Sequence, residues 1–394
     1  MTAARTTILV LAAIAALGSL ATQLLVPALP LLARDLHSNA GDIQLVIGVF
    51  LVGLGGGQLV VGPLADRWGR APVLLGGLSL YVLGSAIAGL APSLPVLLAA
   101  RLLQALGGSA GVVTTRVLVG DLFPPEDVPA RQATLMGVIL ISPALAPVVG
   151  GALADLLGWR AVFALLALTG TAIALLAARA LPKGRRRPAD APPTALAAGY
   201  ARVLANPRFG APALAVAAGS CGLYMYLGSA PFLLAGRYGL APREVGLCLM
   251  LTAAASIAGT FLVARIERRG DAQFTGMTIH FAGGTTMLVL ALAGLTGIAA
   301  FMGPTLLLGL GAGIAGPAGI ARVVRSEPDL AGTATSLAGA LQMLSSALGA
   351  WTLGRFAPVD ATRLGLAEVL VGGLGCLAAG WLWHRQRQPA ESLA

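Results

Sequence analysis

The sequence predicts an all-α membrane protein in which twelve transmembrane helices form two six-helix parallel-repeat domains. Of its 394 residues, 57% are hydrophobic and only 11% are charged, whereas a soluble domain carries about 25% charged residues. Apolar runs that are long enough to cross a bilayer, which takes ~20 helical residues, recur along the whole chain. One long polar segment, 182–209, divides these runs into six and six, as expected of two parallel repeats.

Each expected span is an apolar run bounded by proline, glycine or charged residues, which end helices or mark a membrane surface. The division between the ninth and tenth spans is the least marked, because Leu295-Thr296-Gly297 contains no charge. We expect spans at 7–33, 42–63, 72–92, 95–119, 131–154, 159–181, 210–235, 243–265, 273–294, 298–321, 330–354 and 363–384. The predicted organisation is therefore an N-terminal domain over 1–181, a linker over 182–209 and a C-terminal domain over 210–394.

The basic residues predict the orientation, because cytoplasmic loops of membrane proteins carry an excess of Lys and Arg. With the N-terminus inside, most of the 26 basic residues fall on cytoplasmic ends and loops. We therefore expect both termini in the cytoplasm and a cytoplasmic linker that contains the run Arg185-Arg186-Arg187. The net charge of +10 follows this membrane rule, so no nucleic acid is expected as a partner.

Several function classes lack support in the sequence. The three cysteines, Cys221, Cys248 and Cys376, lie within apolar runs, so neither a disulfide framework nor a metal site is predicted. The only lysine is Lys183, and no G-x-x-x-x-G-K-[ST] phosphate loop is present. No nucleophile–base pair lies within the spans. We therefore expect neither a cofactor nor an enzyme.

The turn between the second and third spans contains more glycine and charge than a connector needs. Its sequence is Gly62-Pro63-Leu64-Ala65-Asp66-Arg67-Trp68-Gly69-Arg70. It resembles the signature loop of the major facilitator superfamily, G-x-L-a-D-r-x-G-r, and matches every fixed position, although Ala71 stands where a further basic residue is usual. The resemblance implies the twelve-helix major facilitator fold.

The same resemblance implies a gating role for this loop, carried by Gly62, Asp66, Arg67, Gly69, Arg70 and Asp121. Asp66 would lie at the N-terminus of the eleventh helix, near Ala331 and Gly332, because a helix N-terminus attracts anions. Arg70 would pair with Asp121 at the inner end of the fourth helix, in a geometry that can be bidentate. These contacts would hold the cytoplasmic side closed in the outward-facing state.

The fourth span contains Arg101 and Gln104, in a segment that resembles the superfamily motif R-x-x-q-G. A guanidinium group inside a span costs ~2.5 kcal/mol or more. Arg101 should therefore face the protein interior and a polar partner. The alternative is that Arg101 extends to the outer membrane surface, as long basic side chains can do.

The fifth span contains Pro143, Pro147, Gly150 and Gly151, which resemble the antiporter motif g-x-x-x-G-P-x-x-G-G. Proline removes a backbone hydrogen bond and bends a helix, and the glycine pair permits close packing against a neighbouring helix. In the superfamily, this motif marks exporters more than importers. An ordinary kinked helix is the alternative interpretation.

Further fragments along the chain resemble the Bcr/CflA group of bacterial drug-resistance exporters. They are Val26-Pro27-Ala28-Leu29-Pro30, Gly158-Trp159-Arg160, Asn206-Pro207-Arg208-Phe209, Ser229-Ala230-Pro231-Phe232 and Ala331-Gly332-Thr333-Ala334. The resemblance implies a monomeric secondary exporter of small amphipathic molecules, such as antibiotics, in the bacterial inner membrane. It also implies alternating access and a proton as the coupling ion.

By this resemblance, the first, fourth, seventh and tenth helices line the substrate path. The polar or aromatic residues near their middles that we expect in the path are Gln23, Arg101, Gln104 and Tyr224. Tyr226 is two residues from Tyr224, so the two rings lie on different faces of the helix and only one of them can face the path. The fixed charge of Arg101 would favour neutral, chloramphenicol-like substrates over cations.

One departure concerns coupling, because the subgroup usually has an acid at the position of Gln23. No acidic residue lies at the middle of an expected span, and the remaining candidate proton carriers are Asp121, His280 and Glu368. An importer or facilitator of an uncharged metabolite would need no proton site, so it remains the alternative function. A third hypothesis, a membrane-bound receptor or enzyme, has no supporting motif within the spans.

Overall fold

The computed structural model describes residues 2–124, 126–180, 194–356 and 359–387. Within these ranges every regular element is a helix. Eleven of the described helical segments are long and apolar enough to cross a membrane. The structure thus confirms the predicted all-helical membrane class. The expected basic run at 185–187 lies outside the described residues.

The chain divides into two compact units. The first unit comprises Met1–Leu196 and Leu234–Met250, and the second comprises Ala197–Leu233 and Leu251–Ala394.

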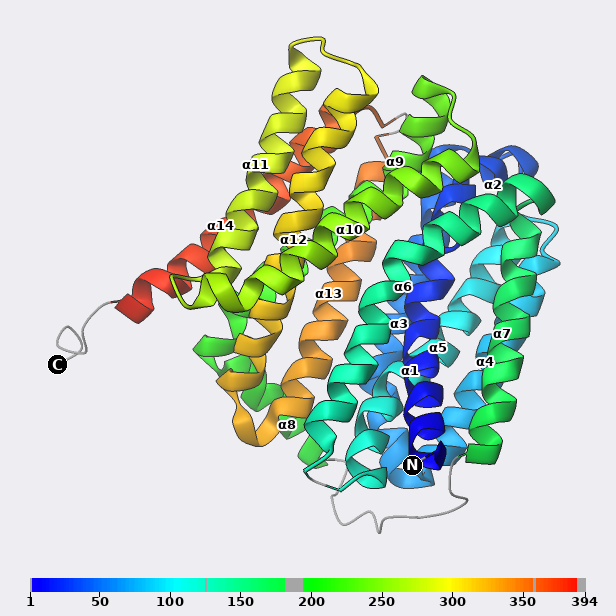
Figure 1. The fold of residues 1–394 in the computed structure, drawn as a ribbon, viewed down its shortest axis with the longest axis vertical. Coiled ribbons are helices and arrows are strands. Elements are labelled where there is room, and N and C mark those ends of the chain that lie inside the picture. Colours follow the sequence, from blue (N-terminus) through cyan, green and yellow to red (C-terminus); the bar gives the residue numbers. More distant parts are fainter. Residues whose placement is uncertain (1, 125, 181–193, 357–358, 388–394) are drawn as a thin grey trace. The chain divides into compact units, whose positions relative to one another are not determined.

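The first unit contains a bundle of long helices (Figure 1), α1 and α3 to α7. Its elements are α1 (Thr2–Gln23), η1 (Val26–Ala28), α2 (Leu29–Asp35), α3 (Ala40–Trp68), α4 (Arg70–Gly89), α5 (Leu94–Leu122), α6 (Val128–Leu157) and α7 (Trp159–Ala180). Six passes return the chain to its starting side, so the N-terminus and the end of α7 lie at the same end of this bundle.

The first expected span, 7–33, is not one continuous helix. The α-helix α1 ends at Gln23, and a 3-10 turn and the short helix α2 follow. Pro27 and Pro30 lie at the starts of these two elements. Since proline donates no backbone hydrogen bond, the regular α-helical ladder is interrupted here.

Glycines allow α4 and α5 to pack with their backbones almost in contact. A Cβ atom on Gly84 would meet the backbone of Gln104, and one on Gly107 would meet the backbone of Tyr81. Small residues permit such close approach between membrane helices. This packing fixes the part of α5 that contains Arg101 against α4.

The second unit contains most of the remaining helices. They are α8 (Thr194–Ala205), α9 (Pro207–Tyr238), α10 (Pro242–Glu267), α11 (Ala272–Leu292), α12 (Ile298–Ser326), η2 (Pro328–Leu330), α13 (Ala331–Gly354) and α14 (Ala361–Arg387). The end of α9 and the start of α10 belong to the first unit. The helix α13 has spanning length but is not among the eleven apolar segments, because it is rich in glycine, serine and threonine.

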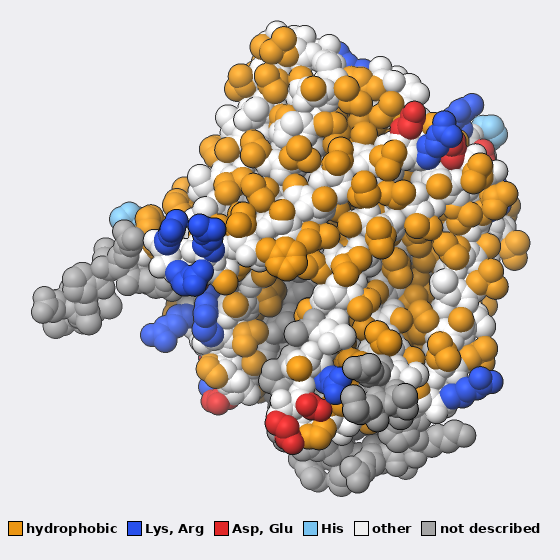
Figure 2. Space-filling model, viewed as in Figure 1, with side chains coloured by type: hydrophobic (Ala, Val, Ile, Leu, Met, Phe, Trp, Pro, Cys, Tyr) orange, Lys and Arg blue, Asp and Glu red, His pale blue; other side chains and the backbone are white. Residues whose placement is uncertain are grey.

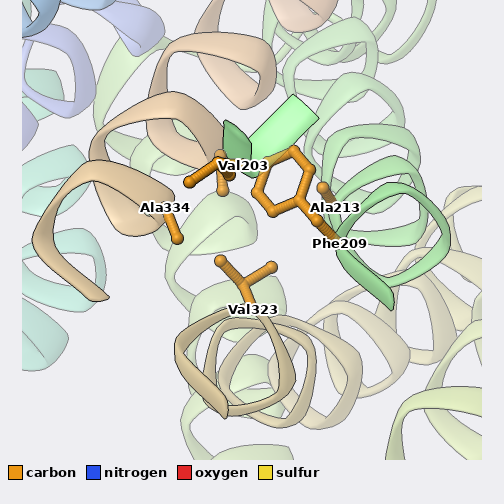
Figure 3. Packing of buried hydrophobic residues seen from close by; sticks show 6 residues of the cluster. Val203, Phe209, Ala213, Val323 and Ala334 are labelled. Atoms are coloured by element: carbon orange, nitrogen blue, oxygen red, sulfur yellow. The ribbon is translucent and has the colours of Figure 1, made fainter. Parts of the chain in front are cut away.

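Within the predicted linker over 182–209, residues Thr194–Ala205 form helix α8. Figure 3 shows Val203 of α8 facing Phe209 and Ala213 of α9, Val323 of α12 and Ala334 of α13. Val203 is completely buried in this cluster.

Hydrophobic side chains cover most of the surface visible in Figure 2, and charged side chains gather in a few groups. Exposed large apolar residues occur on helices of both units, for example Leu80 on α4, Leu168 on α7, Phe261 on α10 and Leu377 on α14. In a soluble protein such a surface would cause aggregation. An apolar surface of this kind is expected of helices that cross a membrane.

Candidate functional site

Arg101 is completely buried inside the first unit. Its Nη1 atom donates to the carbonyl oxygen of Ala21 at 3.1 Å and to Oε1 of Gln104 at 2.6 Å. Its Nε atom donates to the carbonyl oxygen of Val46 at 3.2 Å. The guanidinium carbon lies 4.0 Å from the centre of the Phe50 ring. Arg101 therefore joins α1, α3 and α5, and the alternative of an Arg101 directed to the outer surface is wrong.

Gln104 extends this network to α4. Its Nε2 atom donates to the hydroxyl oxygen of Ser85 at 2.8 Å, and Ser85 donates to the carbonyl oxygen of Tyr81 at 2.7 Å. The hydroxyl of Tyr81 donates to the carbonyl oxygen of Leu17, on α1, at 3.3 Å. The sequence motif thus forms a polar centre that connects four helices. In this conformation Arg101 and Gln104 are enclosed by protein and have no exposed surface.

The break at the end of α1 is packed against the antiporter motif of α6. Gln23 is the last residue of α1 and is nearly buried. A Cβ atom on Gly150 would overlap the carbonyl oxygen of Leu24. Only glycine fits at this contact, so the α6 backbone lies directly against the irregular segment that follows α1.

The second glycine of the motif makes a similar contact with α10, within the first unit. A Cβ atom on Gly151 would meet the carbonyl oxygen of Pro242, and one on Gly246 would meet that of Pro147. The expected close packing of this glycine pair is therefore present. Pro143 and Pro147 both lie inside the continuous helix α6.

The structure brings together two of the expected gating residues. Arg70, at the start of α4, forms an ion pair with Asp121, at the end of α5. Gly69 separates α3 from α4 with φ of 93°, a conformation that L-residues with side chains rarely adopt. Arg67 is exposed and Gly62 is partly buried. The side chain of Asp66 lies outside the described part of the structure.

A second, charge-reversed ion pair occupies the corresponding place in the second unit. Asp271 precedes α11, where its Oδ1 atom accepts a hydrogen bond from the amide of Phe274 at 2.8 Å and caps the helix. Its Oδ2 atom lies 2.6 Å from Nη1 of Arg322, near the end of α12. Arg322 also lies 3.4 Å from Glu267. The acid is now at the helix start and the arginine at the helix end, the reverse of Arg70 and Asp121.

Sequence reasoning did not identify this second pair. The signal was available, because the loop Arg268-Arg269-Gly270-Asp271 holds the same position in the second repeat as the signature loop in the first. This loop matches the signature motif only weakly, however, and its ion pair has the charges of Arg70 and Asp121 exchanged.

The two tyrosines of α9 lie in different surroundings. Tyr226 is buried, and its hydroxyl is 3.0 Å from the hydroxyl oxygen of Thr252 on α10. Thr252 is in turn 3.3 Å from Thr305 on α12. Tyr224 is partly buried. The candidate in the substrate path is thus the tyrosine outside this hydroxyl network.

Two of the candidate proton carriers form a pair inside the second unit. His280 on α11 and Glu368 on α14 are both completely buried, and Nε2 of His280 lies 3.0 Å from Oε2 of Glu368. The third candidate, Asp121, is paired with Arg70 and its side chain is 41% exposed. From the sequence, His280 and Glu368 are separate candidates, because they are 88 positions apart in the chain and nothing local indicates their contact.

No metal centre is formed by the described residues. They contain no group of three or more His, Cys, Asp and Glu side chains that could hold a metal ion. The arrangement instead offers proton-binding groups and close helix contacts.

Comparison with known proteins identifies relatives over nearly the whole chain. It is 31% identical to multidrug resistance protein D of Escherichia coli K12, over 95% of this chain and 94% of that protein. It is 32% identical to a chloramphenicol resistance protein of Pseudomonas aeruginosa, over 84% of this chain and 79% of that one. A bicyclomycin resistance protein homolog of Haemophilus influenzae is 25% identical, over 86% of this chain and 87% of that protein. These relatives confirm the resemblance to the Bcr/CflA group.

The fold also matches solved structures. A bacterial homolog of the lysosomal transporter Spinster, crystallised in an inward-facing and unoccupied conformation, superposes with a TM-score of 0.77. The match covers 98% of this chain and 99% of that chain at 16% sequence identity, so it supports the fold alone.

The model of the Major Facilitator Superfamily matches residues 11–350. That range includes the signature loop, the buried Arg101 network and the glycine contacts of α6. The chain is a multi-pass membrane transporter that belongs to the Major Facilitator Superfamily.

Proposed function

We propose that this protein exports small amphipathic molecules, including antibiotics, from the bacterial cytoplasm by secondary active transport. The observation that carries the proposal is the similarity to multidrug resistance protein D over 95% of the chain. The packing of Gly150 and Gly151 supports it, because the motif that these residues form marks exporters in the superfamily. The protein would lie in the inner membrane as a monomer with both termini in the cytoplasm.

Transport would proceed by alternating access between two six-helix domains, 1–181 and 210–394, joined by the segment 182–209. The loop residues Gly62, Asp66, Arg67, Gly69 and Arg70, with Asp121, would hold the cytoplasmic side closed in the outward-facing state. The Arg70–Asp121 ion pair supports this role. It fixes the start of α4 to the end of α5, so the loop that follows α3 has a rigid support.

The substrates would be neutral rather than cationic. Gln23 is nearly buried at the end of α1, inside the first span, where an acid would otherwise attract cations. Arg101 contributes a fixed positive charge in the same domain. The relative named as a chloramphenicol resistance protein agrees with this preference. Gln23, Arg101, Gln104 and Tyr224 would contact the substrate or position the helices that do.

A facilitator or importer of an uncharged metabolite is the second candidate function. The observation that favours it is again Gln23, because a transporter without proton coupling needs no acid in this span. Chloramphenicol resistance in cells would not follow from that function.

A resistance profile in an efflux-deficient bacterium tests the proposal. Expression of the wild-type protein should raise the inhibitory concentration of chloramphenicol several-fold. The variant Asp121→Asn, which removes the charge that faces Arg70, should lose this resistance at an equal membrane level, whereas Glu126→Gln, on an exposed carboxylate nearby, should retain it. Sensitivity equal to that of the empty vector for all drugs tested, with the wild-type protein present in the membrane, would reject export.

A further inference from the structure

The His280–Glu368 pair is a buried, ionisable contact that the gating loop and the antiporter motif do not involve. Both side chains have 0% exposed surface, and both lie within helices that are apolar and long enough to span a membrane. Ionisable side chains inside a span are costly and usually serve a function, because lipid and apolar protein solvate charge poorly.

Four helices enclose the pair. Nδ1 of His280 lies 3.3 Å from the carbonyl oxygen of Leu308, on α12. On α9, Gly222 leaves space for the pair, since a Cβ atom there would lie 2.5 Å from Oε2 of Glu368 and 2.6 Å from Nε2 of His280. The pair therefore links α11 to α12 and α14 and lies directly against α9.

The groups around the His280–Glu368 pair come from α9, α11 and α12. Helix α11 contributes the imidazole of His280, and α9 contributes the thiol of Cys221, which is close enough to interact electrostatically with the carboxyl group. Helix α12 contributes the carbonyl of Leu308, which contacts the other ring nitrogen of His280. Within the described residues, Oε1 of Glu368 is buried and has no hydrogen-bond partner. A buried oxygen without a partner is costly when it carries charge, so protonation of the carboxyl group relieves part of that cost.

The hydrogen bonds determine how many protons the pair holds. The carbonyl of Leu308 can only accept, so Nδ1 of His280 must carry a hydrogen for that bond to form. The contact between Nε2 and Oε2 then requires one more proton, whether it resides on the imidazole or on the carboxyl group. In both cases the pair is neutral overall and both bonds are satisfied.

Loss of that proton cannot leave the geometry unchanged. If Nδ1 keeps its hydrogen, lone pairs on Nε2 and on the carboxylate face each other at 3.0 Å and repel. If the hydrogen moves to Nε2, the bond to Leu308 is lost and a buried negative charge remains. Deprotonation therefore breaks a link between α11 and either α14 or α12.

We propose that His280 and Glu368 form a proton-binding site of the transport cycle, loaded in the conformation described here. Release of the proton accompanies a rearrangement of α11, α12 and α14. By the superfamily resemblance, α9 and α12 line the substrate path, so this rearrangement reaches the substrate. The inference rests on the proposed function, and it gives the protein a coupling site in place of the acid that is absent at Gln23.

Transport assays separate proton coupling from substrate handling. In proteoliposomes, Glu368→Gln should retain chloramphenicol counterflow, which needs no net proton movement, and lose chloramphenicol accumulation driven by a pH gradient. Gln has the shape and the donor capacity of the protonated acid. His280→Gln should have the same effect, and the control Glu126→Gln should behave as the wild type. Gradient-driven accumulation by Glu368→Gln at the wild-type level would overturn the proposal.

A substrate-free measurement decides the inference even if the proposed function fails. The chain contains only three histidines, so nitrogen NMR of the purified protein with labelled histidine can assign the His280 ring by its absence in His280→Gln. The His280 signals should change with pH in the folded wild type, and Glu368→Gln should shift that transition. If the protonation of the His280 ring is the same at every pH at which the protein remains folded, the proposed proton site is wrong. Absence of all chloramphenicol transport by the wild type would instead reject the proposed function.

Discussion

Arg322, near the end of α12, lies 2.6 Å from the carboxylate of Asp271, the residue that caps α11. The first unit has an equivalent contact with the charges exchanged, in which Arg70 starts α4 and Asp121 ends α5. Each unit thus ties the beginning of its third span to the end of its fourth span by an arginine–carboxylate pair. The two repeats share this link although only the first has the recognisable signature loop.

The Asp271–Arg322 pair should contribute to stability through its charge. Asp271→Asn keeps a good helix cap but leaves the nearly buried Arg322 with only the longer contact to Glu267, so we expect a loss of about 1–3 kcal/mol. Asp360→Asn is the matched control, because Asp360 also caps a helix, through the amide of Arg363, but is exposed. Thermal unfolding in detergent measures both variants. Equal midpoints for Asp271→Asn and Asp360→Asn would contradict the role of the ion pair.

Arg101 should not tolerate replacement by lysine. Its planar guanidinium reaches Ala21, Val46 and Gln104 at once, and a lysine ammonium cannot reproduce that forked geometry. We expect Arg101→Lys to lower the free energy of unfolding by about 2 kcal/mol and to reduce drug resistance strongly. Arg34→Lys, on an exposed residue of α2, should change neither. Wild-type unfolding and resistance in Arg101→Lys would show that the network is dispensable.

Gly150 should be essential for the packing of α6 against the end of α1. An alanine at this position would overlap the carbonyl oxygen of Leu24, and overpacking of this kind typically costs about 1–3 kcal/mol. Gly137, on the same helix, has no atom within 4 Å of the corresponding position, so Gly137→Ala should be neutral or stabilising. Membrane levels and thermal unfolding of the two alanine variants distinguish the positions. Equal behaviour would mean that α6 can move away from α1 without consequence.

Gly222 provides a test of the buried pair that leaves both ionisable residues in place. The added methyl group of Gly222→Ala would lie 2.5 Å from Glu368 and 2.6 Å from His280, so it should separate them and weaken gradient-driven accumulation more than counterflow. Gly219→Ala, one turn earlier, meets only the flexible sulfur of Met277 at 3.4 Å and should behave as the wild type. If the two variants have the same ratio of accumulation to counterflow, the contact with Gly222 has no part in coupling.

Local features of the sequence were sufficient for much of this structure. Apolar length located the helices, and the cost of a charge in a span correctly placed Arg101 in the interior against polar partners. The likeness to a known loop indicated the pairing of Arg70 with Asp121. Each of these inferences uses residues within one segment or a familiar motif.

Contacts between distant segments were beyond local reasoning. His280 and Glu368 gave no sign of their pairing, because their contact depends on how α11 packs against α14 and on the space that Gly222 leaves. The helix α8 was missed because its apolar face has a partner only after α9, α12 and α13 have assembled. The unsatisfied Oε1 atom of Glu368 is likewise visible only in three dimensions.

Transport by membrane vesicles of defined orientation tests the central claim, proton-coupled export, most directly. Inverted vesicles that contain the wild-type protein, energised so that their interior is acidic, should accumulate labelled chloramphenicol, and a protonophore should abolish the accumulation. Vesicles with Glu368→Gln should not accumulate it, and those with Glu126→Gln should. Accumulation that occurs only in right-side-out vesicles, or that persists with the protonophore, would contradict the account.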